Sequence, residues 1–144
     1  MRMRPEQARR AFEGERVARL ATVTPDGAPH LVPVSFAVRG DTVAIAVDHK
    51  PKETTALARL RNIRAEPRVC LLADRYDEDW TRLWWARADG LARVRAEAPA
   101  AAGWLAEKYA PYREHPPEGP YIVVEVRRWS GWSAASVPAP PLDG

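Results

Sequence analysis

One stretch, residues 29–48, decides the fold class; it reads Pro29-His30-Leu31-Val32-Pro33-Val34-Ser35-Phe36-Ala37-Val38-Arg39-Gly40-Asp41-Thr42-Val43-Ala44-Ile45-Ala46-Val47-Asp48. Alternate positions along Pro29–Val38 form two sets of side chains, with the period of two that a β-strand imposes. A second strand is predicted over Thr42–Asp48, and Arg39-Gly40-Asp41 between the two is typical of a tight hairpin turn. The stretch therefore predicts two consecutive antiparallel strands.

Further strands are predicted on both sides of this hairpin. They cover Val17–Thr24, Arg68–Ala73, Arg82–Arg95, Tyr121–Val126 and Arg128–Ala134. Helices are predicted over Pro5–Glu15, over about twelve residues that end near Glu66-Pro67, and over Pro99–Tyr109. Six or seven sequential antiparallel strands with one interrupting helix predict a mainly β fold, a small Greek-key or split barrel with flanking helices. We expect residues 1–136 to form this single domain and residues 137–144 to form a loose, Pro-rich tail.

Composition excludes several classes of protein. The chain has 144 residues and a net charge of +3, and 19 of its 22 basic residues are arginine. Its one cysteine, Cys70, excludes an internal disulfide, and the apolar strand around it predicts a buried thiol. The three histidines are far apart in sequence and lack metal-ligand spacing, so no metal site is expected. The chain has no apolar run that would span a membrane and no secretory signal, which predicts a cytoplasmic protein.

The segment Asp48–Thr55 is the most informative for chemistry. It places Lys50 and Lys52, two of the three lysines in the chain, at the start of a predicted helix, next to the hydroxyls of Thr54 and Thr55. A helix N-terminus offers free backbone N–H groups and the positive end of the dipole, so a phosphate site is one interpretation. A solvated basic loop before an ordinary helix explains the segment equally well.

Two other strands carry candidate binding residues. Pro33 interrupts a good strand and marks an edge or a bulge, against which a flat ring would fit; a plain edge strand is the simpler interpretation. The period of two along Arg82–Arg95 directs Trp84 into the core and sets Trp85 and Arg87 side by side on the opposite face. That second face is expected to line a groove or an interface between subunits.

Several short motifs follow one another in a recognisable order. They are Arg19-Leu20-Ala21-Thr22-Val23, Pro25-Asp26-Gly27-Ala28-Pro29-His30, Val32-Pro33-Val34-Ser35-Phe36, Val47-Asp48-His49-Lys50-Pro51-Lys52, Leu60-Arg61-Asn62-Ile63, Glu66-Pro67-Arg68-Val69, Tyr76-Asp77-Glu78-Asp79-Trp80 and Leu83-Trp84-Trp85-Ala86-Arg87-Ala88-Asp89-Gly90. With this order and spacing, over roughly residues 6–134, the chain resembles the pyridoxamine 5′-phosphate oxidase-like split-barrel flavoproteins. Within them it looks like the branch that depends on coenzyme F420, a deazaflavin.

The resemblance implies a six-stranded, FMN-binding type of split β-barrel that forms a homodimer, with a cofactor groove at the subunit interface. The strand Val32–Ser35 would run along the ring, Val47 and Asp48 would approach the linker, and Lys50 and Lys52 would hold the phosphate. The implied cofactor-binding set is Val32, Pro33, Val34, Ser35, Val47, Asp48, His49, Lys50, Lys52, Thr55, Arg61, Trp85 and Arg87. For Arg61 and Arg87, pairing with nearby acids is the simpler explanation.

The implied activity is hydride transfer between reduced F420 and a small unsaturated organic acceptor, because such a cofactor carries the reactive carbon itself. His30, His49 and Tyr76 are candidate proton donors. Trp85 stands where pyridoxamine-phosphate oxidases have a ring-contacting glutamine, which argues against FMN bound in their manner. The substrate-binding Arg and His of those oxidases are not evident in Ser130–Ser133. The alternatives are an FMN-binding reductase or oxidase on the same fold and a non-catalytic F420 carrier. A nucleic-acid partner is disfavoured, because acids lie among the basic residues.

Overall fold

The structure, a computed structural model, describes residues 1–47 and 54–135 as a mainly β domain with flanking helices. The helices are α1 (Pro5–Glu13), α2 (Thr54–Ala65), α3 (Pro99–Lys108) and α4 (Ala110–Glu114), with a 3₁₀ turn η1 (Trp80–Arg82). The strands are β1 (Ala18–Val23), β2 (Pro29–Val34), β3 (Ala37–Arg39), β4 (Thr42–Ala46), β5 (Arg68–Arg75), β6 (Trp84–Arg95) and β7 (Tyr121–Ser133). The predicted tail after residue 135 lies outside the described residues.

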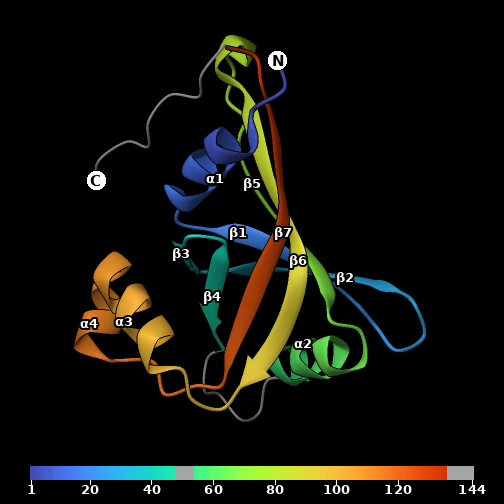
Figure 1. Ribbon diagram of the computed structural model, residues 1–144, viewed down its shortest axis with the longest axis vertical. Coiled ribbons are helices and arrows are strands. Elements are labelled where there is room, and N and C mark those ends of the chain that lie inside the picture. The colour runs from blue at the N-terminus through green and yellow to red at the C-terminus, as the bar shows by residue number, and fades with distance from the viewer. Residues whose placement is uncertain (48–53, 136–144) are drawn as a thin grey trace.

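The strands form one antiparallel sheet in the order β2-β1-β5-β6-β7-β4-β3, with the long strands β6 and β7 at its centre (Figure 1). This order corrects the prediction of a six-stranded barrel: the sheet has seven strands and its two edges, β2 and β3, are not paired with each other. Pro33 lies on β2, which among the described strands pairs with β1 alone, so the predicted edge position is confirmed.

The single strand predicted over Pro29–Val38 is two strands, β2 and β3, because it is broken at Ser35 and Phe36. The Tyr109 hydroxyl accepts a hydrogen bond from the Phe36 N–H at 3.0 Å and lies 3.0 Å from the Phe36 carbonyl oxygen. The Phe36 side chain is fully buried. The backbone N–H and carbonyl of Phe36 are therefore hydrogen-bonded although Phe36 lies outside the paired strands. At this break the chain crosses from one edge of the sheet to the other.

The last two predicted strands, over Tyr121–Val126 and Arg128–Ala134, form one continuous strand, β7. Asp89 pairs with Arg128 and Gly90 pairs with Val126, so Arg127 is an extra residue that forms a bulge. Only glycine fits at position 90, because a Cβ there would lie 2.3 Å from the backbone oxygen of Glu125.

We expect Gly90→Ala to lower the free energy of unfolding by about 2–3 kcal/mol, because the clash is with backbone that cannot move aside without breaking the ladder. Urea denaturation measures the change. Gly103→Ala in α3 is the matched control, since nothing lies within 4 Å of its Cβ, and it is expected to stabilise by about 0.5–1 kcal/mol. Equal effects of the two substitutions would contradict the bulge.

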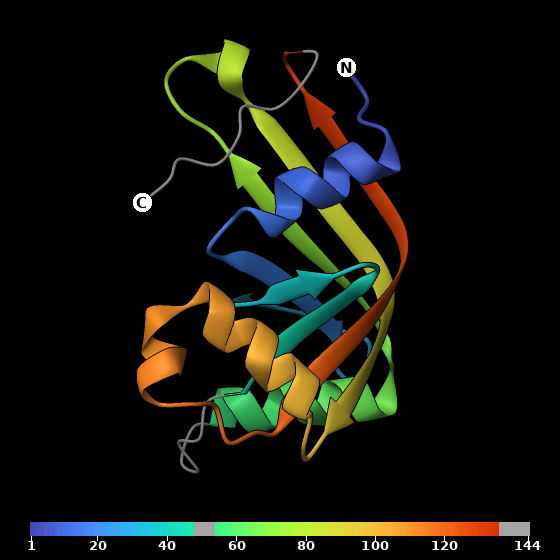
Figure 2. The ribbon, with the colours of Figure 1, turned by 60° about the vertical axis from the view of Figure 1, so that its left-hand side comes forward.

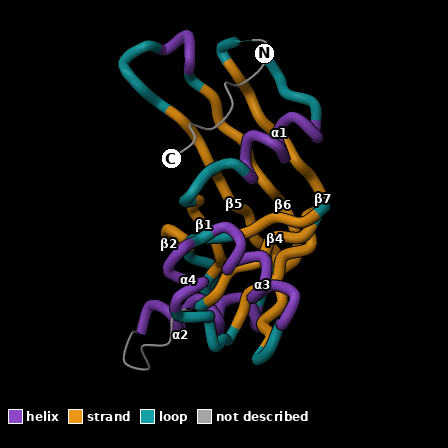
Figure 3. Tube along the Cα trace, turned by 90° about the vertical axis from the view of Figure 1, so that its left-hand side faces the viewer, coloured by secondary structure: helices purple, strands orange, loops and turns teal. Residues whose placement is uncertain are grey.

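The main core lies on the inner face of the sheet, where α1 and α2 pack. Phe12 of α1 is fully buried and lies 4.7 Å from the ring centre of Phe36 and 5.4 Å from that of Trp129. α1 crosses β6 and β7 in the upper part of the molecule (Figures 2 and 3). In α2, buried Asn62 donates from Nδ2 to the Thr22 hydroxyl of β1 at 3.1 Å.

The period of two correctly assigns the faces of β6. Its inward residues Trp84, Ala86, Ala88 and Ala92 are buried. α3 covers a second, smaller core over β3 and β4. α4 was not predicted; it interrupts the expected Pro-rich loop. Among the described helices, none has the length and apolar character needed to cross a membrane.

Candidate cofactor site

The outer face of the sheet carries a row of side chains that spans five strands. Cross-strand pairing aligns Pro33, Arg19, Leu72, Arg87 and Ser130, on β2, β1, β5, β6 and β7. Directly paired residues share a face, and neighbouring strands are about 4.8 Å apart, so Pro33 and Arg87 lie about 14 Å apart on the same face. The register thus brings the predicted edge proline and the predicted arginine onto one surface.

Trp85 and Arg87 form the centre of this surface. Both are half-buried, and the guanidinium carbon of Arg87 lies 5.8 Å from the Trp85 ring centre. Together with Leu72, Asp74 and Tyr76 they line a cleft of about 340 Å³. A second cleft of about 400 Å³ adjoins it across Trp85 and includes Ser130 and Trp132 of β7. Trp85 and Arg87 thus line a groove of the single chain, one of the two surroundings expected for them. Their role in cofactor binding remains a prediction.

The side chains of this surface fit a flat, anionic ring system. Trp85 offers an aromatic face, and Arg87 offers a positive charge. The Arg87 Nε donates a hydrogen bond to a carboxylate oxygen of Asp89 at 3.0 Å, and this is its one hydrogen bond among the described residues. The two terminal guanidinium nitrogens are left for a ligand. The buried hydroxyl oxygen of Ser130, opposite Arg87, has no hydrogen-bond partner among the described residues. Planar rings with oxygen and nitrogen edges use such a combination of aromatic face, cation and unsatisfied donor.

The other predicted site residues are either buried, at least partly exposed, or outside the described side chains. The side chains of Val32, Val34 and Val47 are buried in the core, so only their backbone is available to a ligand. Pro33 and Arg61 are exposed, and Ser35 is half-buried at the break between β2 and β3.

The predicted phosphate site remains a prediction. Asp48, His49, Lys50 and Lys52 lie outside the described residues, and Thr55 is described only as part of the backbone of α2.

Leu72 and Ser130 line the clefts but were not among the predicted site residues. Leu72 belongs to the apolar run Val69-Cys70-Leu71-Leu72, in which the alternation of faces cannot be seen. Buried Val69 and Leu71 occupy the inner face, so Cys70 and Leu72 point outward. This corrects the expectation of a buried thiol: Cys70 is half-buried, and partial burial, together with Asp89, raises its pKa above the ordinary value.

No metal centre is formed by the residues that the structure describes, since they contain no group of three or more His, Cys, Asp or Glu side chains with suitable positions. His30, one of the candidate proton donors, points to the inner side of β2 with Val32 and Val34. Tyr76 is exposed at the rim of the outer cleft. Of the candidate proton donors, Tyr76 alone is placed at the cleft by the described residues.

Many solved structures share this fold, and three of them are named for a bound group. A FAD-binding protein from Mycobacterium smegmatis superposes with a TM-score of 0.65 at 17% identity, over 92% of this chain and 97% of that chain. A FAD-binding protein from Mesorhizobium loti gives a TM-score of 0.67 at 19% identity, over 91% and 93%. A heme-binding protein from M. smegmatis gives a TM-score of 0.72 at 21% identity, over 93% of this chain but 57% of that chain.

Sequence comparison identifies the family. No curated protein sequence matches the chain. The family model described as pyridoxamine 5′-phosphate oxidase matches residues 5–133, nearly the whole length. The chain therefore belongs to the pyridoxamine 5′-phosphate oxidase family.

Proposed function

We propose that the protein is a homodimeric oxidoreductase that binds the deazaflavin coenzyme F420 on the outer face of its sheet. The observation that carries the proposal is the pair of clefts around Trp85 and Arg87. They combine an aromatic face with a guanidinium and a Ser130 hydroxyl, and among the described residues the guanidinium is bonded only through its Nε and the hydroxyl has no hydrogen-bond partner. Reduced F420, when bound, supplies a hydride to a small unsaturated organic acceptor.

The residues of the chain act by binding and orientation. Trp85 would cover one face of the ring, and Leu72 would exclude water beside it. The terminal nitrogens of Arg87 would donate hydrogen bonds to oxygens of the cofactor. Tyr76 is exposed and lines the cleft, and its hydroxyl is the proposed proton donor to an acceptor held there.

The choice of deazaflavin over FMN rests on Trp85 and on charge. An indole in place of the family's glutamine removes an amide that would bond to a flavin ring. Arg2 and Arg128 line the cleft on the other side of Trp85, which suits the phosphate and carboxylates of the F420 tail. A flavin reductase or oxidase is the second candidate, supported by the fold shared with two proteins named as FAD-binding.

Paired titrations of the purified protein with F420, FMN and FAD test the proposal. We expect F420 to bind most tightly, and Trp85→Gln to shift the preference toward FMN. Oxidation of reduced F420 by a panel of unsaturated acceptors then separates an enzyme from a carrier, which would bind F420 without consuming it. Preference of the wild-type protein for FMN or FAD would overturn the deazaflavin assignment and leave the site in place.

The same outer face is the proposed dimer interface. Apolar side chains are exposed along it on four strands, at Val23, Leu31, Leu72 and Trp132. The described helices pack on the inner face or over β3 and β4, and so leave these strands uncovered. An exposed apolar face of this kind on a sheet is typical of an interface. A second copy there would close the cleft from above and shield the ring from water.

Leu31→Asp is expected to convert the dimer to a monomer, because Leu31 is 66% exposed and contributes to the interface rather than to the core. Sedimentation velocity at micromolar concentration measures the change. Ala100→Asp, on the exposed first turn of α3, is the control and should remain dimeric. A wild-type monomer, or a dimer unaffected by Leu31→Asp, would contradict an interface on this face.

A further inference from the structure

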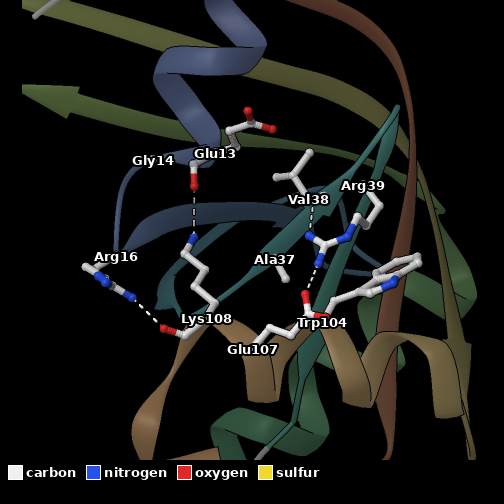
Figure 4. A pocket seen from close by; sticks show the side chains of 9 residues that line it. All are labelled: Glu13, Gly14, Arg16, Ala37, Val38, Arg39, Trp104, Glu107 and Lys108. Atoms are coloured by element: carbon white, nitrogen blue, oxygen red, sulfur yellow. Dashed lines mark hydrogen bonds and ion pairs between the residues drawn. The ribbon is translucent and has the colours of Figure 1, made fainter. Parts of the chain in front are cut away.

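A separate cleft of about 460 Å³ lies between the end of α1, β3 and α3, and shares no lining residue with the clefts around Trp85 (Figure 4). Lys108, the last residue of α3, enters it with its amine. The Lys108 Nζ donates a hydrogen bond to the carbonyl oxygen of Glu13 at 3.2 Å and lies 3.7 Å from the Phe36 ring centre. The amine is thus held in one place with an apolar ring on one side and the open cleft on the other.

The environment of this amine lowers its pKa and so raises the fraction of the neutral form, although the ammonium form stays in the majority at neutral pH. Burial is the main cause that lowers the pKa of Lys108 to about 8, and the positive charge of Arg16 lowers it further, while Glu13 and Glu15 act in the opposite direction. At pH 7.4 a lysine with this pKa is neutral in roughly one molecule in five, compared with about one in a thousand for an ordinary lysine. A neutral amine keeps its lone pair for attack on an electrophile.

The acids around the cleft are occupied by arginines. Glu13 pairs with Arg9 at 3.6 Å, Glu15 pairs with Arg75 at 2.9 Å, and Glu107 is bonded to Arg39. Each of these carboxylates is thus compensated by an arginine, although Glu13 and Glu15 still act to raise the pKa of the amine.

Arg16 also lines this cleft, and its guanidinium has no carboxylate partner among the described residues. It donates from Nη1 to the carbonyl oxygen of Lys108 at 2.6 Å, and it makes no ion pair among the described residues. Its remaining guanidinium N–H groups lie beside the cleft, where Trp104 lines the opposite side. The cleft therefore combines an amine nucleophile with an uncompensated guanidinium that suits a carboxylate or phosphate.

We propose that Lys108 is a nucleophilic amine that condenses with small aldehydes carrying a carboxylate or phosphate, whose anionic group is held by Arg16. The Lys108 Nζ lone pair attacks the carbonyl carbon, and a C–N bond forms. The nitrogen loses its protons, the carbonyl oxygen leaves as water, and a C=N bond remains. The reaction involves no change of oxidation state and needs no further reactant.

The test treats the whole protein with glyoxylate and cyanoborohydride, which reduces any imine to a stable carboxymethyl amine, and maps the adducts by peptide mass spectrometry. Lys50 and Lys52 are internal references in the same chain, and the α-amine of Met1 is scored separately. We expect labelling of Lys108 to be at least tenfold faster than that of the two reference lysines at pH 7.4. Labelling of Lys108 should level off above about pH 8, while labelling of the references continues to rise.

Acetaldehyde, which has no anionic group, serves as the matched probe. Arg16→Gln should remove the preference of Lys108 for glyoxylate and leave its reaction with acetaldehyde in place. Lys108→Arg should abolish the adduct on this peptide. Uniform labelling of all three lysines, or an equal preference for the two aldehydes in the wild-type protein, would overturn the proposal, and neither result depends on a variant folding.

Discussion

Arg87→Ala is expected to weaken cofactor binding by about 10- to 100-fold, the largest effect on binding that a single substitution on the outer face should have. A hydrogen bond from a charged group contributes about 1.5–3 kcal/mol, and each 1.4 kcal/mol is tenfold in affinity. Among the described residues, Arg87 is hydrogen-bonded only through its Nε, to Asp89. The substitution should therefore lower the affinity for the cofactor more than it lowers the stability of the fold. Isothermal titration with F420 measures the change.

Arg93→Ala is the matched control for this experiment. Arg93 lies on the same strand and has the same outward phase as Arg87, but it is exposed and does not line either cleft around Trp85. It should change the affinity by less than about threefold, as expected for a solvent-screened charge. Equal effects at the two positions would mean that general positive charge, not the cleft, draws the cofactor.

Phe12→Ala is expected to lower the free energy of unfolding by about 3–5 kcal/mol, the largest stability effect that we predict. Phe12 is fully buried and its ring contacts Phe36 and Trp129, so it fixes α1 to the sheet and lies beside the crossing between its two edges. The cavity left by this substitution should weaken both the packing of α1 on the sheet and the packing around the crossing at Phe36. Chemical denaturation with urea gives the free energy, extrapolated to water.

Phe12→Leu keeps most of the volume and should cost less than half as much. A loss under about 1 kcal/mol for Phe12→Ala would show that α1 does not pack on β6 and β7 as described. The prediction uses stability alone and is independent of any cofactor.

The faces of the long strands could be predicted from the sequence, because alternation is a local property. Trp84 is buried and its neighbour Trp85 faces the outer cleft, as the period of two along β6 indicates. The break at Phe36 could not be predicted, since it depends on hydrogen bonds with the Tyr109 hydroxyl, 73 residues away in the chain. The bulge at Arg127 likewise depends on register with β6, which no local pattern records.

The candidate site was predictable only in part for the same reason. Trp85 and Arg87 are two positions apart on one strand, so the sequence places them together. Leu72 and Ser130 join them through pairing with two other strands, and that register is a property of the whole sheet. Lys50 and Lys52 were identified from a local motif and lie outside the described residues, so the phosphate site stays a prediction.

A crystal structure of the protein with F420 bound is the most direct test of the central claim that the cofactor ring lies on the outer face of the sheet. We predict the ring in contact with Trp85, with a terminal nitrogen of Arg87 at hydrogen-bond distance from one of its oxygens and a second copy of the chain covering the cleft. A ring bound against another surface, with Trp85 and Arg87 left in contact with solvent, would contradict it.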